Sequence, residues 1–455
     1  MIRRVKIISE SSASACLTAH PQTLAHLNLE KGEQVTLVFG NVYEEVTLAL
    51  DPDLDLNMLR VCSDTLSHLH LPTTVEYEVK RQGNSLIIGP FIGVLAAVSD
   101  NQLENNENYL ASFTANYEQI GGALLIFSLE GVDPGSQTIQ GWIFNPTYNR
   151  WEKGTYAYPA AILSIVEVSL TDKWNLFQEL STHFYQTLGP RIFNYPIFDK
   201  WEMYRWLRRH PNLKHHLPET VLLNDSSDVK RMLKKYGKIF IKPVVGRLGA
   251  GVIEATFDRP KVIVKTRVYG QNIKHIFADH KRFISYLQTV TASEKYLIQQ
   301  AIPLLTLKGR VIDFRLTLVK DDTNQWANIG LFARYGAKRS IISNITSGGY
   351  AEWGKKGLKQ TLDINRRKAN QWNNKMTMIA RHAALELEKR GIHCANLGFD
   401  LAIDKNKKLW LIEINNQNPD HFIAVVAGRT DKFLQARSAN LLYAKRLAGF
   451  PRNGT

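Results

Sequence analysis

The chain has 455 residues, of which 44% are hydrophobic and 22% charged. This composition excludes a disordered chain, and the length suggests roughly two to four domains. The net charge of +15 favours anionic partners such as nucleotides, phosphates, polycarboxylates or nucleic acid.

The positions of the three cysteines and the lengths of the apolar runs indicate the cellular compartment of the protein. Cys16, Cys62 and Cys394 are too far apart for a Cys-x-x-Cys motif or a disulfide framework, which fits a reducing environment. No apolar run approaches about 18 residues, so we expect no transmembrane helix. The N-terminus lacks the apolar segment of a signal peptide. We therefore expect a cytoplasmic protein without a membrane partner.

Residues 1–90 contain mainly short strands, and two helices are expected at Gln22–Leu27 and Ser63–His70. A leucine-rich turn follows each helix and leads into another strand. The repeated order of helix, leucine-rich turn and strand predicts a duplicated half-barrel, of which a double-psi-like barrel is one form. We expect residues 1–90 to form a β-rich leader domain.

Residues 91–198 have an α/β pattern. Strands are expected at Ala123–Phe127, Trp142–Phe144 and Ala160–Val168, and a helix at Asn175–Thr187, where apolar residues recur at helical spacing. These residues predict a small open-sheet domain.

Helices and strands alternate from residue 199 onward, which predicts a third domain over residues 199–455, with a lid subdomain at about 219–300. Ser226 or Ser227 is expected to cap a helix that runs through Lys235. A long helix is expected at Asn365–Arg390, with an apolar stripe facing the core. Two hairpins are expected: Val311–Lys320 with Trp326–Tyr335, and Leu397–Ile403 with Leu409–Asn415.

The segment KIFIKPVVGRLGAGV, residues 238–252, contains a lysine followed by a glycine-rich turn. Lys242 closes a short apolar strand, and Gly246, Gly249 and Gly251 follow. Glycines let backbone N–H groups approach a phosphate closely, and an ammonium adds charge. An ordinary hairpin with a glycine turn accounts for the segment equally well. The order of lysine and then glycines excludes a Walker A loop and a protein kinase loop, and is typical of ATP-grasp enzymes.

The last hairpin carries three oxygen-bearing side chains within apolar strands. Glu413 and Asn415 lie two residues apart on one strand and share a face, and folding about the turn brings Asp400 opposite Glu413. Like charges so placed repel unless a cation joins them, and Mg²⁺ prefers oxygen ligands. The alternative is that one acid is exposed and the other pairs with a lysine.

Three further polar segments are candidates for binding. Asp313 and Arg315 share a strand face, where Arg315 could bind a carboxylate or phosphate or form a structural pair. Arg334, with Asn344 and Ser347-Gly348-Gly349, could hold substrate or the γ-phosphate. Gln299-Gln300-Ala301-Ile302 could bond an adenine edge or simply end a strand.

These motifs occur in the order found in ATP-grasp enzymes. The details, including FDKWEMYRWL followed by LPET, resemble the YheC/YheD-type endospore coat-associated ATP-grasp family. The resemblance covers most of the chain and is strongest from Phe198 to Ala427. It rests on Lys200 in FDKW, Lys242 in IKP, Gly246–Gly251, Gln299-Gln300, Asp313-Phe314-Arg315, and Asp400 with Glu413-x-Asn415.

The resemblance implies a mixed α/β (α+β) ATP-grasp fold after a leader domain and a pre-ATP-grasp domain. It also implies roles for the nucleotide-binding residues. Lys200 and Lys242 would contact the α- and β-phosphates. The Gly246–Gly251 loop would cover the triphosphate, with Arg247 at its tip, and Gln299-Gln300-Ala301-Ile302 would be the adenine hinge.

The resemblance further implies that Asp400, Glu413 and Asn415 hold one or two Mg²⁺ ions, and that Arg315 stabilises the transferred phosphoryl group. The implied activity is an ATP- and Mg²⁺-dependent carboxylate–amine or carboxylate–thiol ligase acting through an acyl-phosphate. Its substrates would be small molecules or peptides, and it would act in endospore formation or in the coat. The alternative is a non-catalytic nucleotide-binding protein of spore-coat assembly. We expect no nucleic-acid partner.

Overall fold

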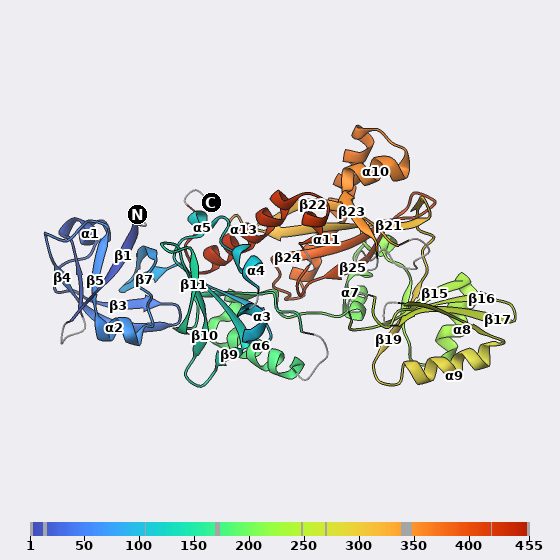
Figure 1. The fold of residues 1–455 in the computed structure, drawn as a ribbon, viewed down its shortest axis with the longest axis horizontal. Coiled ribbons are helices and arrows are strands. Elements are labelled where there is room, and N and C mark those ends of the chain that lie inside the picture. The colour runs from blue at the N-terminus through green and yellow to red at the C-terminus, as the bar shows by residue number, and fades with distance from the viewer. Residues whose placement is uncertain are drawn as a thin grey trace. The chain divides into compact units, whose positions relative to one another are not determined.

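The computed structural model describes residues 3–11, 16–104, 106–168, 173–246, 249–268, 271–337, 348–419 and 421–452. Two compact units are present (Figure 1). Unit 1 comprises residues 1–195, 320–325 and 434–455, and unit 2 comprises residues 196–319 and 326–433. The expected α/β class is confirmed. The division at residues 90 and 198 stays a prediction, and the structure groups residues 434–455 with the N-terminal part of the chain.

Unit 1 begins with a closed barrel in the strand order β1-β5-β2-β4-β3-β7-β6. The pairs β1·β5, β2·β4 and β3·β7 are parallel. Helices α1 (Pro21–His26) and α2 (Ser63–His68) form where two helices were expected. The barrel strands are β1 (Arg3–Glu10), β2 (Cys16–Ala19), β3 (Gln34–Phe39), β4 (Val42–Leu50), β5 (Met58–Cys62), β6 (Glu76–Gln82) and β7 (Ser85–Gly89).

The second sheet of unit 1 has the order β11-β10-β9-β8-β12-β13. The 15-residue helix α6 (Trp174–Leu188) packs on β9 and β13. Sequence patterning missed β11, since this strand is largely exposed and has no apolar run. The strands are β8 (Phe91–Ala97), β9 (Ala123–Asp133), β10 (Thr138–Asn145), β11 (Arg150–Ala157), β12 (Ala161–Ser164) and β13 (Ile192–Phe193), and the short helices are α3 (Asp100–Glu104), α4 (Glu107–Ala111) and α5 (Tyr117–Ile120).

The first sheet of unit 2 has the order β14-β19-β15-β16-β17-β18, and helices α8 (Ser226–Tyr236) and α9 (His280–Val290) cover one face of it (Figure 1). Asp225 caps α8 by accepting a hydrogen bond from the Ser227 N–H at 2.6 Å. The expected serine cap is therefore wrong, because an aspartate one residue earlier supplies the acceptor. The strands are β14 (Thr220–Leu222), β15 (Lys238–Pro243), β16 (Ile253–Asp258), β17 (Lys261–Val268), β18 (Gln271–Phe277) and β19 (Tyr296–Gln300).

The second sheet of unit 2 has the order β23-β22-β21-β24-β25, with β20 pairing to β21. The long helix α11 (Arg366–Glu388) buries Met376 and Ile379 against Phe314 and Phe399 of this sheet, as its apolar stripe predicts. The strands are β20 (Thr306–Leu307), β21 (Arg310–Lys320), β22 (Trp326–Tyr335), β23 (Tyr350–Trp353), β24 (Asn396–Ile403) and β25 (Leu409–Asn415), and the other helices of unit 2 are α7 (Lys200–Leu207), α10 (Gly354–Leu362) and α12 (Ile423–Val426). Helix α13 (Thr430–Leu447) begins in unit 2, and its residues from 434 onward belong to unit 1.

The two faces of this sheet differ in polarity. Side chains alternate along a strand, so one face of β21 and β24 packs on α11 while the other carries Asp313, Arg315 and Asp400. These three polar residues are nevertheless buried. A polar layer therefore covers one side of an apolar sheet.

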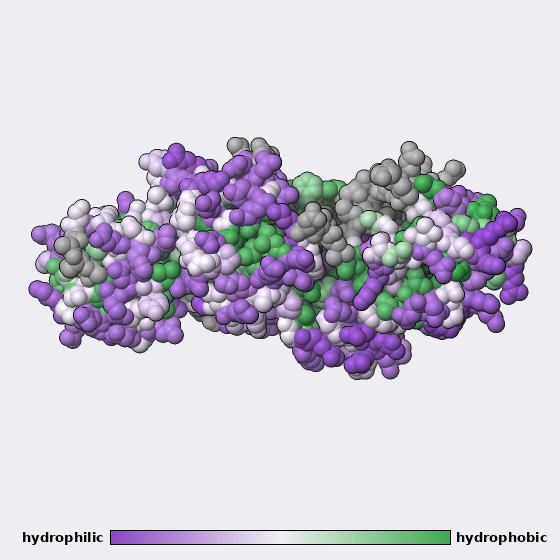
Figure 2. All heavy atoms as spheres, turned by 90° about the horizontal axis from the view of Figure 1, so that it is seen from below, coloured by the Kyte–Doolittle hydropathy of each residue, from purple (hydrophilic) through white to green (hydrophobic). Residues whose placement is uncertain are grey.

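Hydrophilic residues cover most of the surface that is visible in Figure 2, and hydrophobic residues form separate patches. Within the described ranges, no helix combines the length and the apolar character needed to cross a membrane.

Candidate nucleotide site

Lys200 joins the glycine loop to an acidic side chain of the second sheet. It lies in the first turn of α7, which Asp199 and Glu202 cap reciprocally with hydrogen bonds of 2.8 and 3.1 Å. The Lys200 Nζ donates to the Gly246 carbonyl oxygen at 2.6 Å and lies 3.6 Å from the Glu413 Oε1. The capped helix therefore fixes one ammonium between the loop and Glu413.

Lys242 lies on the face of β15 opposite Ile239 and Ile241, which are buried in the core beneath α8 and α9. Its Nζ donates to the Gln299 Oε1 at 2.7 Å, and the Gln299 Nε2 donates to the Thr220 Oγ1 at 3.1 Å. Gln299 thus holds the lysine in place and is itself held by β14.

The pKa of Lys242 is lowered to about 8, mainly by burial, against the carboxylate of Glu413, which raises it. Lys200 also lowers this pKa, and the carboxylate of Asp400 also raises it. These effects place the ammonium of Lys242 within electrostatic range of Glu413, Asp400 and Lys200. The structure thus brings together the two lysines and the two acids that the sequence singled out.

The acidic hairpin brings Asp400 opposite Glu413, as expected, with an irregularity in the ladder between Asp400 and Leu401. Asp400 on β24 pairs with Glu413 on β25, and Gly398 pairs with Asn415. The Asn415 Nδ2 donates to the Gly398 carbonyl at 3.4 Å. Glu413 and Asn415 therefore lie beside Asp400 on adjacent strands.

Asp400 is buried between two arginines. The Arg315 Nε donates to its Oδ1 at 2.5 Å and the Arg315 Nη2 to its Oδ2 at 3.3 Å. The Arg334 Nη2 lies 3.0 Å from the same Oδ2, and Arg334 also bonds both oxygens of Asp313, at 2.7 and 2.6 Å. Burial alone would raise the pKa of Asp400, but the two guanidinium groups outweigh it and keep that pKa below its usual range.

Sequence reasoning missed the position of Arg334. It grouped this residue with Asn344 and Ser347, which lie outside the described residues, whereas Arg334 bridges Asp313 and Asp400. Counting back along both strands from the turn between β21 and β22 would have brought Arg334 near Asp313. Arg315 pairs with Asp400 across the β21·β24 ladder, and its role toward a phosphoryl group stays a prediction.

The oxygen atoms of these side chains are ligands of the kind that a hard cation prefers. Glu413 and Asn415 offer carboxylate and amide oxygens, while the oxygens of Asp400 already accept hydrogen bonds from Arg315 and lie close to Arg334. Among the described residues, no group of three or more His, Cys, Asp or Glu side chains could hold a metal by itself. A bound Mg²⁺ would thus need phosphate oxygens as well.

The segment from Gln299 to Ile302 is engaged within the protein at several points. The Gln300 N–H donates to the Glu219 carbonyl at 2.9 Å, and the Ala301 N–H donates to the Lys238 carbonyl at 3.3 Å. The Ile302 carbonyl accepts from Leu304 at 2.8 Å. The side chain of Gln299 bonds Lys242 and Thr220, so it orients the lysine. The hinge role of this segment stays a prediction.

The glycine loop requires glycine at its C-terminal end. Gly249 and Gly251 have φ values of +76° and +67°, which are strained for other residues. A Cβ on Gly251 would also lie 2.7 Å from the Cγ of Pro243. Gly246 accepts the bond from Lys200, and Arg247 lies outside the described residues.

A model of the YheC/D like ATP-grasp family matches residues 189–447, which is more than half of the chain. The chain belongs to this family, and the resemblance read from its motifs is confirmed, as is the ATP-grasp fold. It is similar to the endospore coat-associated protein YheD of Bacillus subtilis (strain 168), with 24% identity over 78% of each chain. The endospore coat-associated protein YheC of the same strain is 22% identical over 48% of this chain and 59% of that protein.

Solved structures are also similar. The ATP-grasp ligase PsnB complexed with precursor peptide PsnA2 and AMPPNP is 16% identical, with a TM-score of 0.42 over 77% of this chain and 99% of that chain. D-alanyl-alanine synthetase A from Vibrio cholerae O1 biovar eltor str. N16961 is 11% identical, with a TM-score of 0.44 over 77% of this chain and 98% of that chain. At TM-scores this low, the superpositions support no conclusion about this chain.

The titration of Lys242 provides a direct test of this geometry. We expect Lys242 to reach half-maximal modification by an amine-selective reagent near pH 8, followed residue by residue by mass spectrometry. Glu413→Gln should lower this pH and Lys200→Met should raise it, because the carboxylate favours the ammonium and the neighbouring lysine opposes it.

The exposed Lys261 serves as the internal control, and its modification should not respond to either variant. A Lys242 whose half-maximal modification lies far from pH 8, or does not change with either substitution, would contradict the placement of these four groups.

Proposed function

We propose that this protein is an ATP- and Mg²⁺-dependent ligase that joins a carboxylate to an amine, or to a thiol, through an acyl-phosphate. The observation that carries the proposal is the convergence of Lys200 and Lys242 with Asp400 and Glu413 in unit 2. Membership of an ATP-grasp family supports it.

The charge of the cluster suits this reaction. Four cationic side chains outnumber three anionic ones, so the cluster has an excess of positive charge to offer a triphosphate and a carboxylate substrate. The cations are Lys200, Lys242, Arg315 and Arg334, and the anions are Asp313, Asp400 and Glu413.

In the proposed reaction, a substrate carboxylate oxygen attacks the γ-phosphorus of ATP, and the bond to the β-phosphate oxygen breaks to release ADP. The amine then attacks the carbonyl carbon of the acyl-phosphate, inorganic phosphate leaves and the amine loses a proton. Phosphoryl transfer needs positioning and neutralisation of charge more than a protein nucleophile. Bound Mg²⁺ would neutralise phosphate charge and steady the attacking and leaving oxygens.

We assign the side chains as follows. Lys200 and Lys242 bind the α- and β-phosphates, with Lys242 oriented by Gln299. Glu413 and Asn415, with Asp400, hold Mg²⁺ together with the phosphates. Arg315 stabilises the transferred phosphoryl group, and Arg334 fixes Asp400 from the other side.

The remaining assignments concern the glycine loop, the adenine hinge and the cellular location of the reaction. Gly246, Arg247, Gly249 and Gly251 cover the triphosphate, while Gln300 and Ile302 contact the adenine through their backbone. We place the reaction in the cytoplasm of a spore-forming cell or at the forming coat, because the matched relatives are named as endospore coat-associated.

A non-catalytic nucleotide-binding role in coat assembly is the second candidate. One observation favours it: Asp400 is already neutralised by Arg315 and Arg334, so a metal would compete with two arginines for its oxygens. Binding and turnover have to be measured separately to distinguish the two candidates.

Nucleotide binding is tested by thermal denaturation. Millimolar Mg·ATP should raise the melting temperature, because a ligand that binds the folded state stabilises it. Lys242→Ala should greatly reduce the shift, whereas Lys261→Ala, at an exposed position on β17, should retain it. A wild-type protein that shows no shift would exclude both candidates.

Catalysis is tested by the release of ADP with a panel of carboxylic acids and amines. Glu413→Ala should reduce Mg²⁺-dependent turnover by about a hundredfold or more, corresponding to ~3 kcal/mol of lost transition-state stabilisation. Glu294→Ala, at an exposed position in the same unit, is the matched control and should turn over normally.

Equal rates for Glu413→Ala and the wild type would refute the metal assignment. A wild-type protein that binds Mg·ATP but releases no ADP with any pair of substrates would instead support the assembly role.

A further inference from the structure

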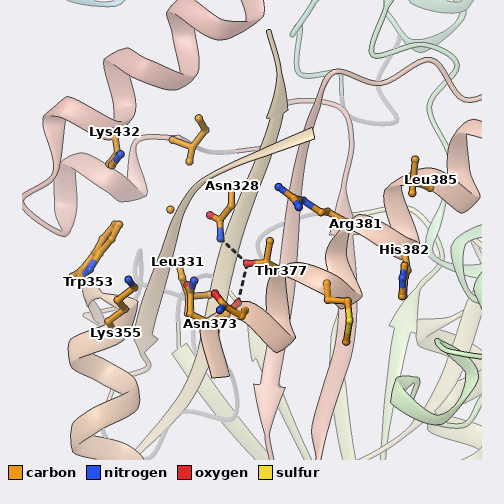
Figure 3. A pocket seen from close by; sticks show the side chains of 14 residues that line it. Asn328, Leu331, Trp353, Lys355, Asn373, Thr377, Arg381, His382, Leu385 and Lys432 are labelled. Carbon is orange, nitrogen blue, oxygen red and sulfur yellow. Dashed lines mark hydrogen bonds between the residues drawn. The ribbon is translucent and has the colours of Figure 1, made fainter. Parts of the chain in front are cut away.

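A cavity of about 650 Å³ lies in unit 2 beside the N-terminal half of β22 (Figure 3). Its walls come from β22, α11, the start of α10 and the start of α13. None of the residues assigned above to nucleotide, metal or phosphoryl transfer lines it. It is therefore a separate site from the nucleotide cluster.

The cavity meets β22 at the edge of the strand. Four consecutive residues, Asn328 to Leu331, line it. Successive side chains of a strand point to opposite faces, but Asn328 and Leu331 both reach the α11 side of the sheet, so the alternation along this stretch of β22 is interrupted. The edge strand β23 pairs with Phe332–Tyr335 and, within the described residues, with no earlier part of β22. A Cβ on Gly354, which follows β23, would lie 2.6 Å from the Leu331 carbonyl oxygen, so this residue covers the edge at Leu331. The uncovered edge is therefore Asn328 to Gly330, and its backbone donors and acceptors face the cavity.

Side-chain hydrogen bonds fix the floor of the cavity. The Asn328 Nδ2 donates to the Thr377 Oγ1 at 2.7 Å, and the Thr377 Oγ1 donates to the Asn373 carbonyl at 2.8 Å. In Figure 3 the first of these bonds joins β22 to α11, and the second lies within α11. The strand edge is thus held at a constant distance from the helix, as a preformed binding site requires.

The lining is cationic and partly apolar. Lys355, Arg381 and Lys432 stand around the cavity, and the described lining residues include no Asp or Glu. Two large apolar side chains of the lining are unusually exposed, Met378 at 50% and Leu385 at 47%. Exposed apolar groups beside an open strand edge indicate a surface that a partner covers.

We propose that this cavity binds an extended peptide segment rich in Asp or Glu, which adds as a strand to the open edge of β22. The backbone of the segment pairs with Asn328 to Gly330, its carboxylates meet Lys355 and Arg381, and its apolar side chains cover Met378 and Leu385. Strand addition of this kind obtains affinity from the backbone and specificity from alternate side chains. The proposal goes beyond the ligase function and does not depend on it.

Two other occupants fit the cavity less well. A small anion would satisfy the cations but leave the strand edge and the apolar groups uncovered. A nucleic acid would also satisfy the cations, but it offers no ladder of alternating donors and acceptors to a strand edge. The peptide satisfies the edge, the charge and the apolar surface together.

The test is a binding titration without nucleotide, followed by fluorescence anisotropy. The probe is a fluorescein-labelled six-residue peptide of alternating glutamate and valine. Arg381→Glu should weaken its binding by about tenfold, because the reversal replaces an attraction with a repulsion. Arg367→Glu, at an exposed position outside the cavity on the same helix, should leave the affinity unchanged.

Three further probes decide between the occupants. A lysine–valine peptide and a probe with N-methyl groups at every residue should not bind, since the first has the wrong charge and the second cannot form the ladder. A labelled oligothymidylate should bind no more tightly to the wild type than to Arg381→Glu.

The proposal is overturned if the N-methylated probe binds as tightly as its parent, or if citrate displaces the probe at equal carboxylate concentration. It is also overturned if the oligothymidylate binds in the cavity with equal affinity, or if Arg381→Glu has no effect. Because ATP is absent throughout, none of these outcomes bears on the ligase proposal.

Discussion

The ion-pair network around Asp400 is the constraint on which the rest of unit 2 depends. A buried carboxylate is costly unless it is paired, and here it is paired twice, with Arg315 on β21 and Arg334 on β22. Asp313 in turn binds Arg334. The network therefore ties three strands together on the face of the sheet that α11 does not cover, and it allows a polar layer to exist within a folded core.

This layer sets the surroundings of the remaining charged groups. Glu413 lies in register with Asp400, and Lys200 reaches Glu413 from a helix that is fixed by its own cap. Lys242 approaches from the first sheet and is held by Gln299. Three separate parts of the chain thus supply the charges of a single cluster, and its excess positive charge is what an anionic nucleotide would neutralise.

Sequence reasoning predicted those features that follow from local alternation and spacing. The buried stripe of α11 and the positions of the two lysines at the ends of their elements follow from periodicity or from motif order. The sequence also predicted that Asp400 lies opposite Glu413, but not the irregularity in the ladder through which the two residues pair. It did not predict that Gln299 bonds Lys242 or that Arg334 contacts Asp400. It also did not predict that β22 extends beyond the residues that pair with β23. These depend on pairing between elements that are distant in the chain, about which a single strand pattern carries no information.

A crystal structure of the protein with Mg²⁺ and a non-hydrolysable ATP analogue would test the central claim most directly. The account predicts that the triphosphate lies between the ammonium groups of Lys200 and Lys242 and the carboxylate of Glu413, with the metal bound by Glu413 and by phosphate oxygens. A nucleotide bound elsewhere, or a triphosphate that contacts neither lysine, would contradict it.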